Sequence, residues 1–327
     1  ITGRVAIGLK ALDSGRLRVR LDLVDNMTCD GVLAGDLPLV FTHEGDSLVV
    51  EFPSPLGTAE PETVTVSWHG RPQAHGNFLS GLMFRSHDSG TPSDPSDDVP
   101  VVANQNQPWS AHSWWPCKDH PADKALVSLT ATVPDVLQLI SNGSLLAEES
   151  PGPGLRRFFG REAYPIATYL VSVAATNYSS WTEVCQPAGA GPTRLDFHVF
   201  PQDRANAEID LAPTCDMLAL MTELAGPYPF VGEKYAQAEF KWFGSMEHQT
   251  ASSLSPIIFR GDRYFELVVI HELAHQWFGD SLTPEQWSDI WLNEGFARYL
   301  EALWLEDEYG AETYRDYMRQ IGVERHP

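Results

Sequence analysis

Short runs of alternating apolar and polar residues dominate the first half of the chain. The alternation is clearest in three runs, residues 17–23, 64–68 and 127–133. A period of two is that of a strand with one face buried. Turn-forming Gly, Asn and Asp residues separate the runs. We therefore expect a β-rich region of saddle or sandwich type, with residues 171–178 as its last strand.

The apolar residues of the second half recur with the period of a helix. One helix is predicted from about residue 205 to 225, where a Gly-Pro pair ends it, and a second from about residue 264 to 278. Residues 283–286, Thr-Pro-Glu-Gln, form a capping-box signature with proline at the first helical position. We expect a long third helix from there to at least Tyr309.

The change of period divides the chain into two predicted domains. The length of 327 residues allows two domains of roughly 150 residues each, both large enough to bury a core. We place a β-rich N-terminal domain at residues 1–199 and the N-terminal portion of a mostly helical domain at residues 200–327. The predicted fold is therefore α+β and multidomain.

The composition excludes several classes of function. Forty-four acidic residues face 22 basic ones, which gives a formal charge of -22. This balance argues against nucleic acid as a partner, because affinity for a phosphate backbone comes mainly from Lys and Arg. No apolar run approaches the ~18 residues of a membrane helix, so we expect no transmembrane segment in this chain. The oligomeric state and the compartment cannot be deduced from these observations.

The four cysteines do not suggest a metal or redox site. They form no C-x-x-C pair. Their wide separation allows disulfides without requiring them, and we expect free, buried cysteines. They are Cys29, Cys117, Cys185 and Cys215.

The chemistry is carried by an H-E-x-x-H motif inside the second predicted helix. Residues i and i+4 leave the same face of a helix, so the imidazoles of His271 and His275 can reach one zinc ion. Glu272 lies beside them and can act as general base toward water. A chance match somewhere in a chain of this length has a probability of roughly 0.02.

A catalytic zinc site needs a third protein ligand and an open position. Glu294 follows His275 by eighteen residues and supplies the carboxylate. The other common pattern, H-E-x-x-H-x-x-G-x-x-H, fails because Phe278 and Ser281 occupy the Gly and His places. Two histidines and one glutamate form the catalytic rather than the structural type of zinc site, and we predict one zinc per chain.

These motifs resemble those of the aminopeptidase N family of zinc metallopeptidases, which are gluzincins. The resemblance lies in H-E-L-A-H-Q-W-F-G-D at residues 271–280 and in W-L-N-E-G-F-A at residues 291–297. Gly244-Ser245-Met246-Glu247-His248 is similar to the family's exopeptidase motif G-x-M-E-N. A weaker match covers Gln105-Asn106-Gln107 and the W-P-C-K-D segment that follows at residues 115–119.

The resemblance implies that residues 200–327 are the N-terminal portion of a thermolysin-like zinc catalytic domain, and it implies a role for each matching residue. His271, His275 and Glu294 would ligate zinc, and Glu272 would be the general base. Glu247 and Gln107 would hold the free α-ammonium of a peptide substrate, with the peptide lined by Gly244, Ser245 and Met246. The implied function is a zinc-dependent aminopeptidase that removes N-terminal residues from peptides by means of a zinc-activated water. Peptides without a free amine would be disfavoured, because a buried carboxylate gains from a cation only if the substrate brings one.

Two departures from the family pattern bear on this expectation. His248 occupies the family's Asn place, and a protonated imidazole there would add a like charge beside the substrate amine. The family's catalytic Tyr, which stabilises the oxyanion, would lie several tens of residues beyond Pro327. We therefore expect a fragment of a longer enzyme that lacks part of its catalytic machinery and is inactive alone.

Two other functions remain open at this point. A thermolysin-like zinc endopeptidase shares the H-E-x-x-H motif and the distant glutamate, but it has no reason to carry the segment from Gly244 to Glu247. A non-catalytic binding module on the same fold is the second alternative, although all three ligands and the base are intact. Arg298 and Glu301 are plausible partners of the ligands, and an ordinary helix salt bridge explains them equally well.

Overall fold

The structure is a computed structural model that describes residues 1–74, 79–88 and 94–323. Its contacts divide the chain into two compact units. The first comprises residues 1–83 and 104–123, and the second comprises residues 84–103 and 124–327. This division follows contacts rather than the change in period along the sequence, and the boundary near residue 199 stays a prediction.

The first unit contains two antiparallel sheets around one apolar core. The four-stranded sheet has the order β1-β7-β3-β4 and the three-stranded sheet the order β2-β6-β5. Alternate residues of the strands point into the core, where Leu21, Leu48, Val50 and Val66 are buried, as the period of two predicts. The strands are β1 (Thr2–Leu9), β2 (Arg18–Asp22), β3 (Met27–Ala34), β4 (Leu37–Pro38), β5 (Val40–Glu44), β6 (Ser47–Glu51) and β7 (Glu62–Gly70).

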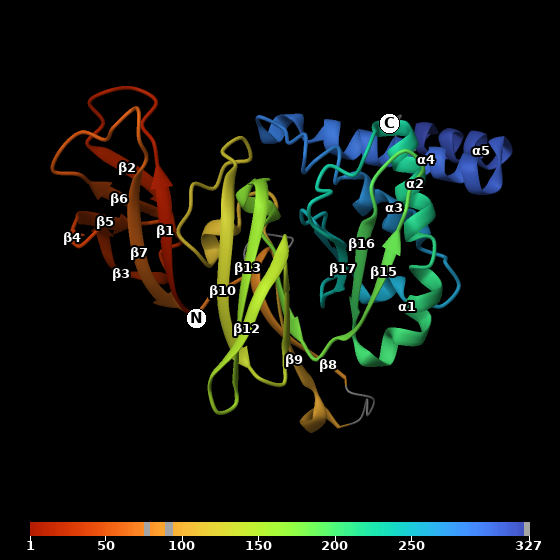
Figure 1. The fold of residues 1–327 in the computed structure, drawn as a ribbon, viewed down its shortest axis with the longest axis horizontal. Coiled ribbons are helices and arrows are strands. Elements are labelled where there is room, and N and C mark those ends of the chain that lie inside the picture. The colour runs from red at the N-terminus through yellow and green to blue at the C-terminus, as the bar shows by residue number, and fades with distance from the viewer. Residues whose placement is uncertain (75–78, 89–93, 324–327) are drawn as a thin grey trace. The chain divides into compact units, whose positions relative to one another are not determined.

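Two further sheets open the second unit (Figure 1). One has the order β10-β13-β12 and the other the order β11-β14-β9-β8. The predicted strand at residues 127–133 lies within β10, and the one at 171–178 contains β14. The expectation that this is the last strand of the β-rich region is wrong, because β15 (Ser179–Cys185) and β16 (Thr193–Val199) follow it within residues 1–199. The strands are β8 (Gly81–His87), β9 (Val99–Gln105), β10 (Ala125–Pro134), β11 (Gln138–Ser141), β12 (Ser144–Gly152), β13 (Leu155–Ile166) and β14 (Val173–Thr176).

A mixed sheet and five helices complete the second unit and hold its largest core. In the order β15-β16-β17-β18, the first pair is antiparallel and the others are parallel. Buried side chains of this sheet pack with Met217, Leu273 and Trp304 from three helices. The strands are β15 (Ser179–Cys185), β16 (Thr193–Val199), β17 (Tyr235–Glu239) and β18 (Ala251–Leu254); the helices are α1 (Arg204–Asp210), α2 (Thr214–Ala225), α3 (Glu266–Ala274), α4 (Trp291–Tyr309) and α5 (Ala311–Val323).

The helices of the second unit differ from the prediction at two points. The helix predicted over residues 205–225 is two helices, because Pro213 disfavours helical backbone before it and is the N-cap residue of α2. The long helix does not start at the predicted capping box. Thr283 Oγ1 donates to the carbonyl oxygens of Gly279 and Asp280 instead, and α4 begins only at Trp291.

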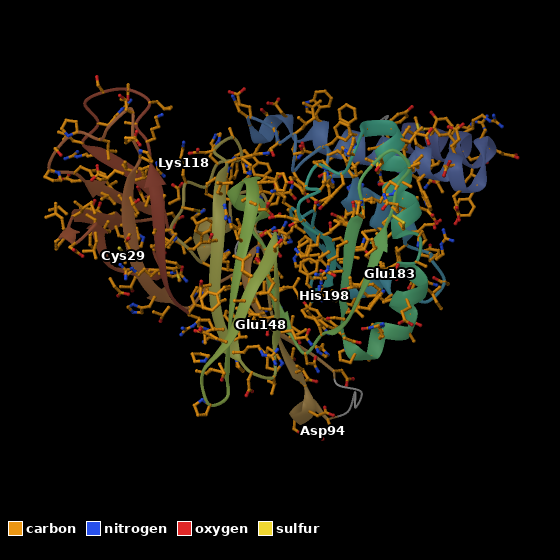
Figure 2. The ribbon with its side chains drawn as sticks, in the orientation of Figure 1. Cys29, Asp94, Lys118, Glu148, Glu183 and His198 are labelled. Carbon is orange, nitrogen blue, oxygen red and sulfur yellow. A yellow bond between two sulfur atoms is a disulfide. The ribbon has the colours of Figure 1, made fainter. Side chains whose placement is uncertain are left out.

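The expectation of four free cysteines is wrong for one pair. Cys185, the last residue of β15, and Cys215, the second residue of α2, form a disulfide with their Cα atoms 5.3 Å apart. The packing of α2 on the sheet brings them together, which spacing along the chain does not reveal. Within the described residues Cys29 (Figure 2) and Cys117 are free. Across those residues no helix is both long and apolar enough to cross a membrane.

Candidate active site

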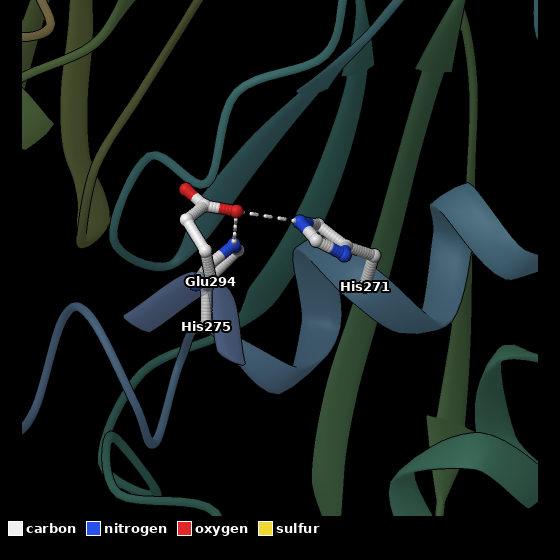
Figure 3. Close-up of side chains that lie close together, drawn as sticks. All are labelled: His271, His275 and Glu294. Carbon is white, nitrogen blue, oxygen red and sulfur yellow. Dashed lines mark ion pairs between the residues drawn. The ribbon is translucent and has the colours of Figure 1, made fainter. Parts of the chain in front are cut away.

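The structure brings the three predicted zinc ligands together. His271 lies on α3, His275 directly follows that helix, and Glu294 is in the first turn of α4. Glu294 Oε2 lies 3.2 Å from His271 Nε2 and 3.8 Å from His275 Nε2 (Figure 3). One donor atom from each residue falls within 4.8 Å of the other two.

Each histidine is held from behind by its other ring nitrogen. His271 Nδ1 bonds to Glu301 Oε1 at 2.6 Å, and His275 Nδ1 bonds to the carbonyl oxygen of Phe278 at 3.0 Å. Glu301 also accepts from Arg298 at 2.9 Å and from the Tyr317 hydroxyl. These contacts fix the ring orientations, so that both Nε2 atoms face Glu294.

The charges at the site favour a cation. Burial alone would lower the pKa of His271, but Glu294 and Glu301, one at each ring nitrogen, raise it to about 10. Burial and the neighbouring His271 lower the pKa of His275 to about 4. His275 is therefore a neutral imidazole at neutral pH, the form that ligates metal.

The donor set fits a catalytic zinc ion. Zinc takes imidazole nitrogen and carboxylate oxygen, and catalytic sites use three protein ligands. The two Nε2 atoms and one carboxylate oxygen provide that set, and the hydrogen bonds to the Nδ1 atoms supply the usual support of metal-binding histidines. His271, His275 and Glu294 would hold the ion.

Glu272 and Glu247 lie beside the same site. Their carboxylate oxygens and a ring nitrogen of His275 are within 4.8 Å of one another. Glu272 is only 6% exposed, and its pKa is raised well above the usual range, mainly by burial and further by Glu247 and Glu294. Perturbation of this kind is typical of a catalytic acid or base.

Glu247 is a buried carboxylate with spare hydrogen-bonding capacity. Its Oε1 atom has no hydrogen-bond partner among the residues that the structure describes. Burial, and after it the charge of Glu294, raise its pKa to about 8. A cation that arrives with a substrate would therefore stabilise its charged form.

His248 does not place a second positive charge beside the expected position of the substrate amine. The side chain is fully buried, and its Nδ1 atom lies 2.8 Å from Ser253 Oγ. Burial lowers its pKa to about 3. The imidazole is therefore neutral at neutral pH and does not repel an amine beside Glu247.

The other residues predicted to contact the substrate, 244–246, directly precede Glu247. A Cβ at Gly244 would lie 2.5 Å from the Trp242 ring, so this position requires glycine unless the ring moves. Ser245 Oγ accepts from Ser255 N at 3.3 Å. Met246 is buried and pairs with Ser253 through two backbone hydrogen bonds of 2.8 Å.

Gln107 belongs to the first compact unit, whereas the other site residues belong to the second. It is half-buried, and its carbonyl oxygen accepts from Ser80 Oγ at 3.2 Å. Its role toward the substrate ammonium stays a prediction.

Two residues near the site were missed by sequence reasoning. Tyr317 on α5 reaches Glu301, and nothing in its spacing indicates this contact. Gln276 bonds to the segment that carries Glu247. From the sequence, Glu301 could be either a partner of a zinc ligand or part of an ordinary helix salt bridge. In the structure it makes both contacts, with His271 and with Arg298. Its spacing of seven residues from Glu294 was the usable signal, because two helical turns return to the same face.

Family models match most of the chain. The peptidase M1 N-terminal domain matches residues 12–170, and the peptidase family M1 domain matches residues 221–325. The second match contains both motifs of the zinc site. The chain belongs to peptidase family M1. The two matches lie on either side of the predicted domain boundary.

Curated relatives and solved structures agree with membership of family M1. Aminopeptidase B of Rattus norvegicus is 27% identical over 80% of the chain, and leucine aminopeptidase 2 of Aspergillus terreus is 30% identical over 71%. The chain spans 37% of the length of each. An M1 zinc metallopeptidase from Deinococcus radiodurans matches with a TM-score of 0.83 at 24% identity, over 98% of the chain and 70% of that structure. Yeast LTA4 hydrolase matches with a TM-score of 0.75 at 22% identity, over 96% of the chain and 47% of that structure. The sheet-rich first part and the helical second part thus have the fold of M1 metallopeptidases.

Proposed function

We propose that this chain carries the zinc site and the amine-binding site of an aminopeptidase, which removes N-terminal residues from peptides. The supporting observation is the position of Glu247. A buried carboxylate with an unpartnered oxygen, judged over the described residues, lies within 4.8 Å of the donor atoms of Glu272 and His275. The matching relatives include proteins named as aminopeptidases.

The distances between these groups suit cleavage after the first residue. An ammonium group held by Glu247 leaves only a short distance to the zinc ligands. The first peptide bond of a substrate would then lie between Glu272 and the ligand set. An endopeptidase must instead accept chain on both sides of the cut and gains nothing from this carboxylate.

The residues divide the chemistry between binding and proton transfer. Zinc in such a site acts as a Lewis acid that polarises the scissile carbonyl and makes water easier to deprotonate. Glu272 takes the proton from the attacking water and returns it to the leaving amine. Glu247 fixes the position of the substrate's first residue through its charge. We carry Gln107 as a second ligand of the ammonium on the resemblance of its motif alone.

Matched peptides with free and N-acetylated termini test the proposal. Acetylation removes the charge that Glu247 is expected to bind, so the zinc-loaded parent enzyme that contains this chain should cleave the free peptide and spare the acetylated one. Glu247→Ala should lower kcat/KM for the free peptide by roughly 2–5 kcal/mol in transition-state free energy. The exposed Glu285→Ala serves as control.

Three outcomes would contradict the aminopeptidase. Equal cleavage of both peptides would remove the role of Glu247. Internal cuts in a long peptide would indicate a thermolysin-like endopeptidase. Peptide binding without hydrolysis by the zinc-loaded parent enzyme would indicate a binding module.

A further inference from the structure

A glutamine directly after the H-E-x-x-H motif joins the zinc-binding segment to the residues around Glu247. Gln276 is 0% exposed. Its Oε1 accepts from the backbone N–H of Thr250 at 2.8 Å, and its Nε2 donates to the backbone oxygen of His248 at 3.3 Å. Nε2 also lies 3.5 Å from the backbone oxygen of Glu247 and 2.7 Å from Asp280 Oδ2. One side chain thus contacts the backbone on both sides of the turn that follows Glu247.

The segment that it contacts, residues 246–253, is called here the Glu247 loop. Two backbone hydrogen bonds between Met246 and Ser253 close its base, and Ala251 N donates to His248 O at 3.0 Å across a turn. The loop is buried, and a buried backbone N–H needs a partner. For Thr250 that partner is Gln276, so the shape of the loop depends on a side chain outside it.

Thr250 has a backbone conformation that threonine disfavours, so contacts from other residues must stabilise it. Thr250 has a φ of 60°, a left-handed conformation that is disfavoured for a β-branched residue. Such a residue persists only where its surroundings hold it, and it often lies at a functional site. Its Oγ1 accepts from Gly143 N at 2.7 Å and donates to Glu162 Oε2 at 3.2 Å. Gln276 provides the contact from the zinc-binding side.

We propose that Gln276 is a positioning residue that fixes the distance between the Glu247 carboxylate and the zinc ligands, and thereby the preference for substrates with a free amine. The inference rests on the proposed function. Gln276 directly follows His275 in the chain. Its hydrogen bonds to the Glu247 loop therefore fix the position of that loop relative to the metal site. Without it, zinc binding can persist while Glu247 moves relative to the metal.

The test compares two fully buried glutamines that differ in their hydrogen bonding. Gln276→Met keeps the size of the side chain and removes its hydrogen bonds. Gln249→Met is the matched control, because Gln249 is equally buried within the loop and its amide atoms have no hydrogen-bond partner within residues 1–74, 79–88 and 94–323. Gln276→Glu retains an acceptor for Thr250 N–H but loses the Nε2 donor to His248 O and Asp280 Oδ2, so it separates the two sets of contacts. Glu247→Gln reports on the amine site itself.

Two measurements are made on the zinc-loaded proteins. Hydrogen exchange reads the protection of the Thr250 amide. Calorimetry compares the binding of L-leucine amide with that of its N-acetyl derivative. For Gln276→Met we expect faster exchange at Thr250, unchanged zinc content and a preference for the free amine reduced about tenfold or more. Gln249→Met should retain the preference, and Gln276→Glu should recover the protection of Thr250.

The outcomes separate this inference from the function on which it rests. Glu247→Gln with an unchanged preference would overturn the proposed amine site, and the inference with it. If Glu247→Gln loses the preference while Gln276→Met retains it, Glu247 binds the amine and only the positioning role is wrong. Equal losses in Gln276→Met and Gln249→Met would show a general packing effect and would also overturn the positioning role.

Discussion

His271 and Glu301 are joined by a 2.6 Å hydrogen bond between Nδ1 and Oε1, although 30 residues separate them. Glu301 lies two turns after the proposed ligand Glu294 on α4, so one helix would supply both a ligand and the support of another ligand. Arg298 and Tyr317 in turn bond to the Glu301 carboxylate. The zinc site therefore depends on the packing of α3, α4 and α5.

Loss of the Glu301 charge should weaken zinc binding without removing a ligand. Glu301→Gln should lower zinc affinity by roughly 10–100-fold, because the His271 ring loses a charged partner that orients it. Competition with a chelator measures the affinity. His271→Ala should lose the metal altogether by elemental analysis, and the exposed Glu306→Gln on the same helix should behave as wild type. A zinc affinity of Glu301→Gln equal to that of wild type would show that the Phe278 contact and the packing of α3 and α4 are sufficient to orient the ligands.

In the full-length parent enzyme, Glu272→Gln should retain zinc and lose hydrolysis. The amide has the size of the carboxylate but cannot take a proton from water, so we expect turnover to fall by about a hundredfold or more. Zinc content and kcat are measured on the same preparation. Turnover near the wild-type value with zinc bound would place the general base elsewhere.

His248 should make stability depend on pH on the acid side. Its pKa is lowered from 6.5 to about 3 in the folded chain, so the unfolded chain binds the proton first as pH falls. Stability is then lost between about pH 6.5 and pH 3. His248→Asn removes this term.

Chemical denaturation of wild type and His248→Asn at pH 7.5 and pH 5 tests the prediction. Between pH 7.5 and pH 5, the free energy of unfolding of wild type should fall by about 2 kcal/mol more than that of His248→Asn. A difference that does not change with pH would mean that the folded protein accommodates a protonated His248.

Removal of the disulfide should destabilise the second unit. Cys215→Ser should lower the free energy of unfolding by about 2–4 kcal/mol, because the bond closes a segment of 30 residues and restricts the unfolded chain. Thermal unfolding with and without reductant measures the effect. Reductant should lower the Tm of wild type and of the control Cys29→Ser, but not that of Cys215→Ser. A wild-type Tm that is insensitive to reductant would contradict the disulfide.

The three residues proposed as zinc ligands could be found from the sequence because each rests on a local regularity. His271 lies on α3 and His275 directly after that helix, at the spacing of four residues that brings both rings to one face, and Glu294 follows at a set distance. The same reasoning placed the strands around residues 17–23, 64–68 and 127–133, where alternation repeats within a few residues. The start of α4 could not be placed in this way, because Thr283 bonds to the preceding turn rather than to the helix that its motif predicts.

What only the tertiary structure decided depends on contacts between distant segments. The neutral state of His248 follows from burial, which no single segment determines. The contact of Gln276 with Thr250 and the disulfide between Cys185 and Cys215 each join elements that only packing brings together. The pattern of neighbouring residues determines the period of a helix or strand, and this period determines the face on which each proposed ligand lies. The surroundings that set charge, orientation and access come from side chains tens of residues away, and these are fixed only when the core forms.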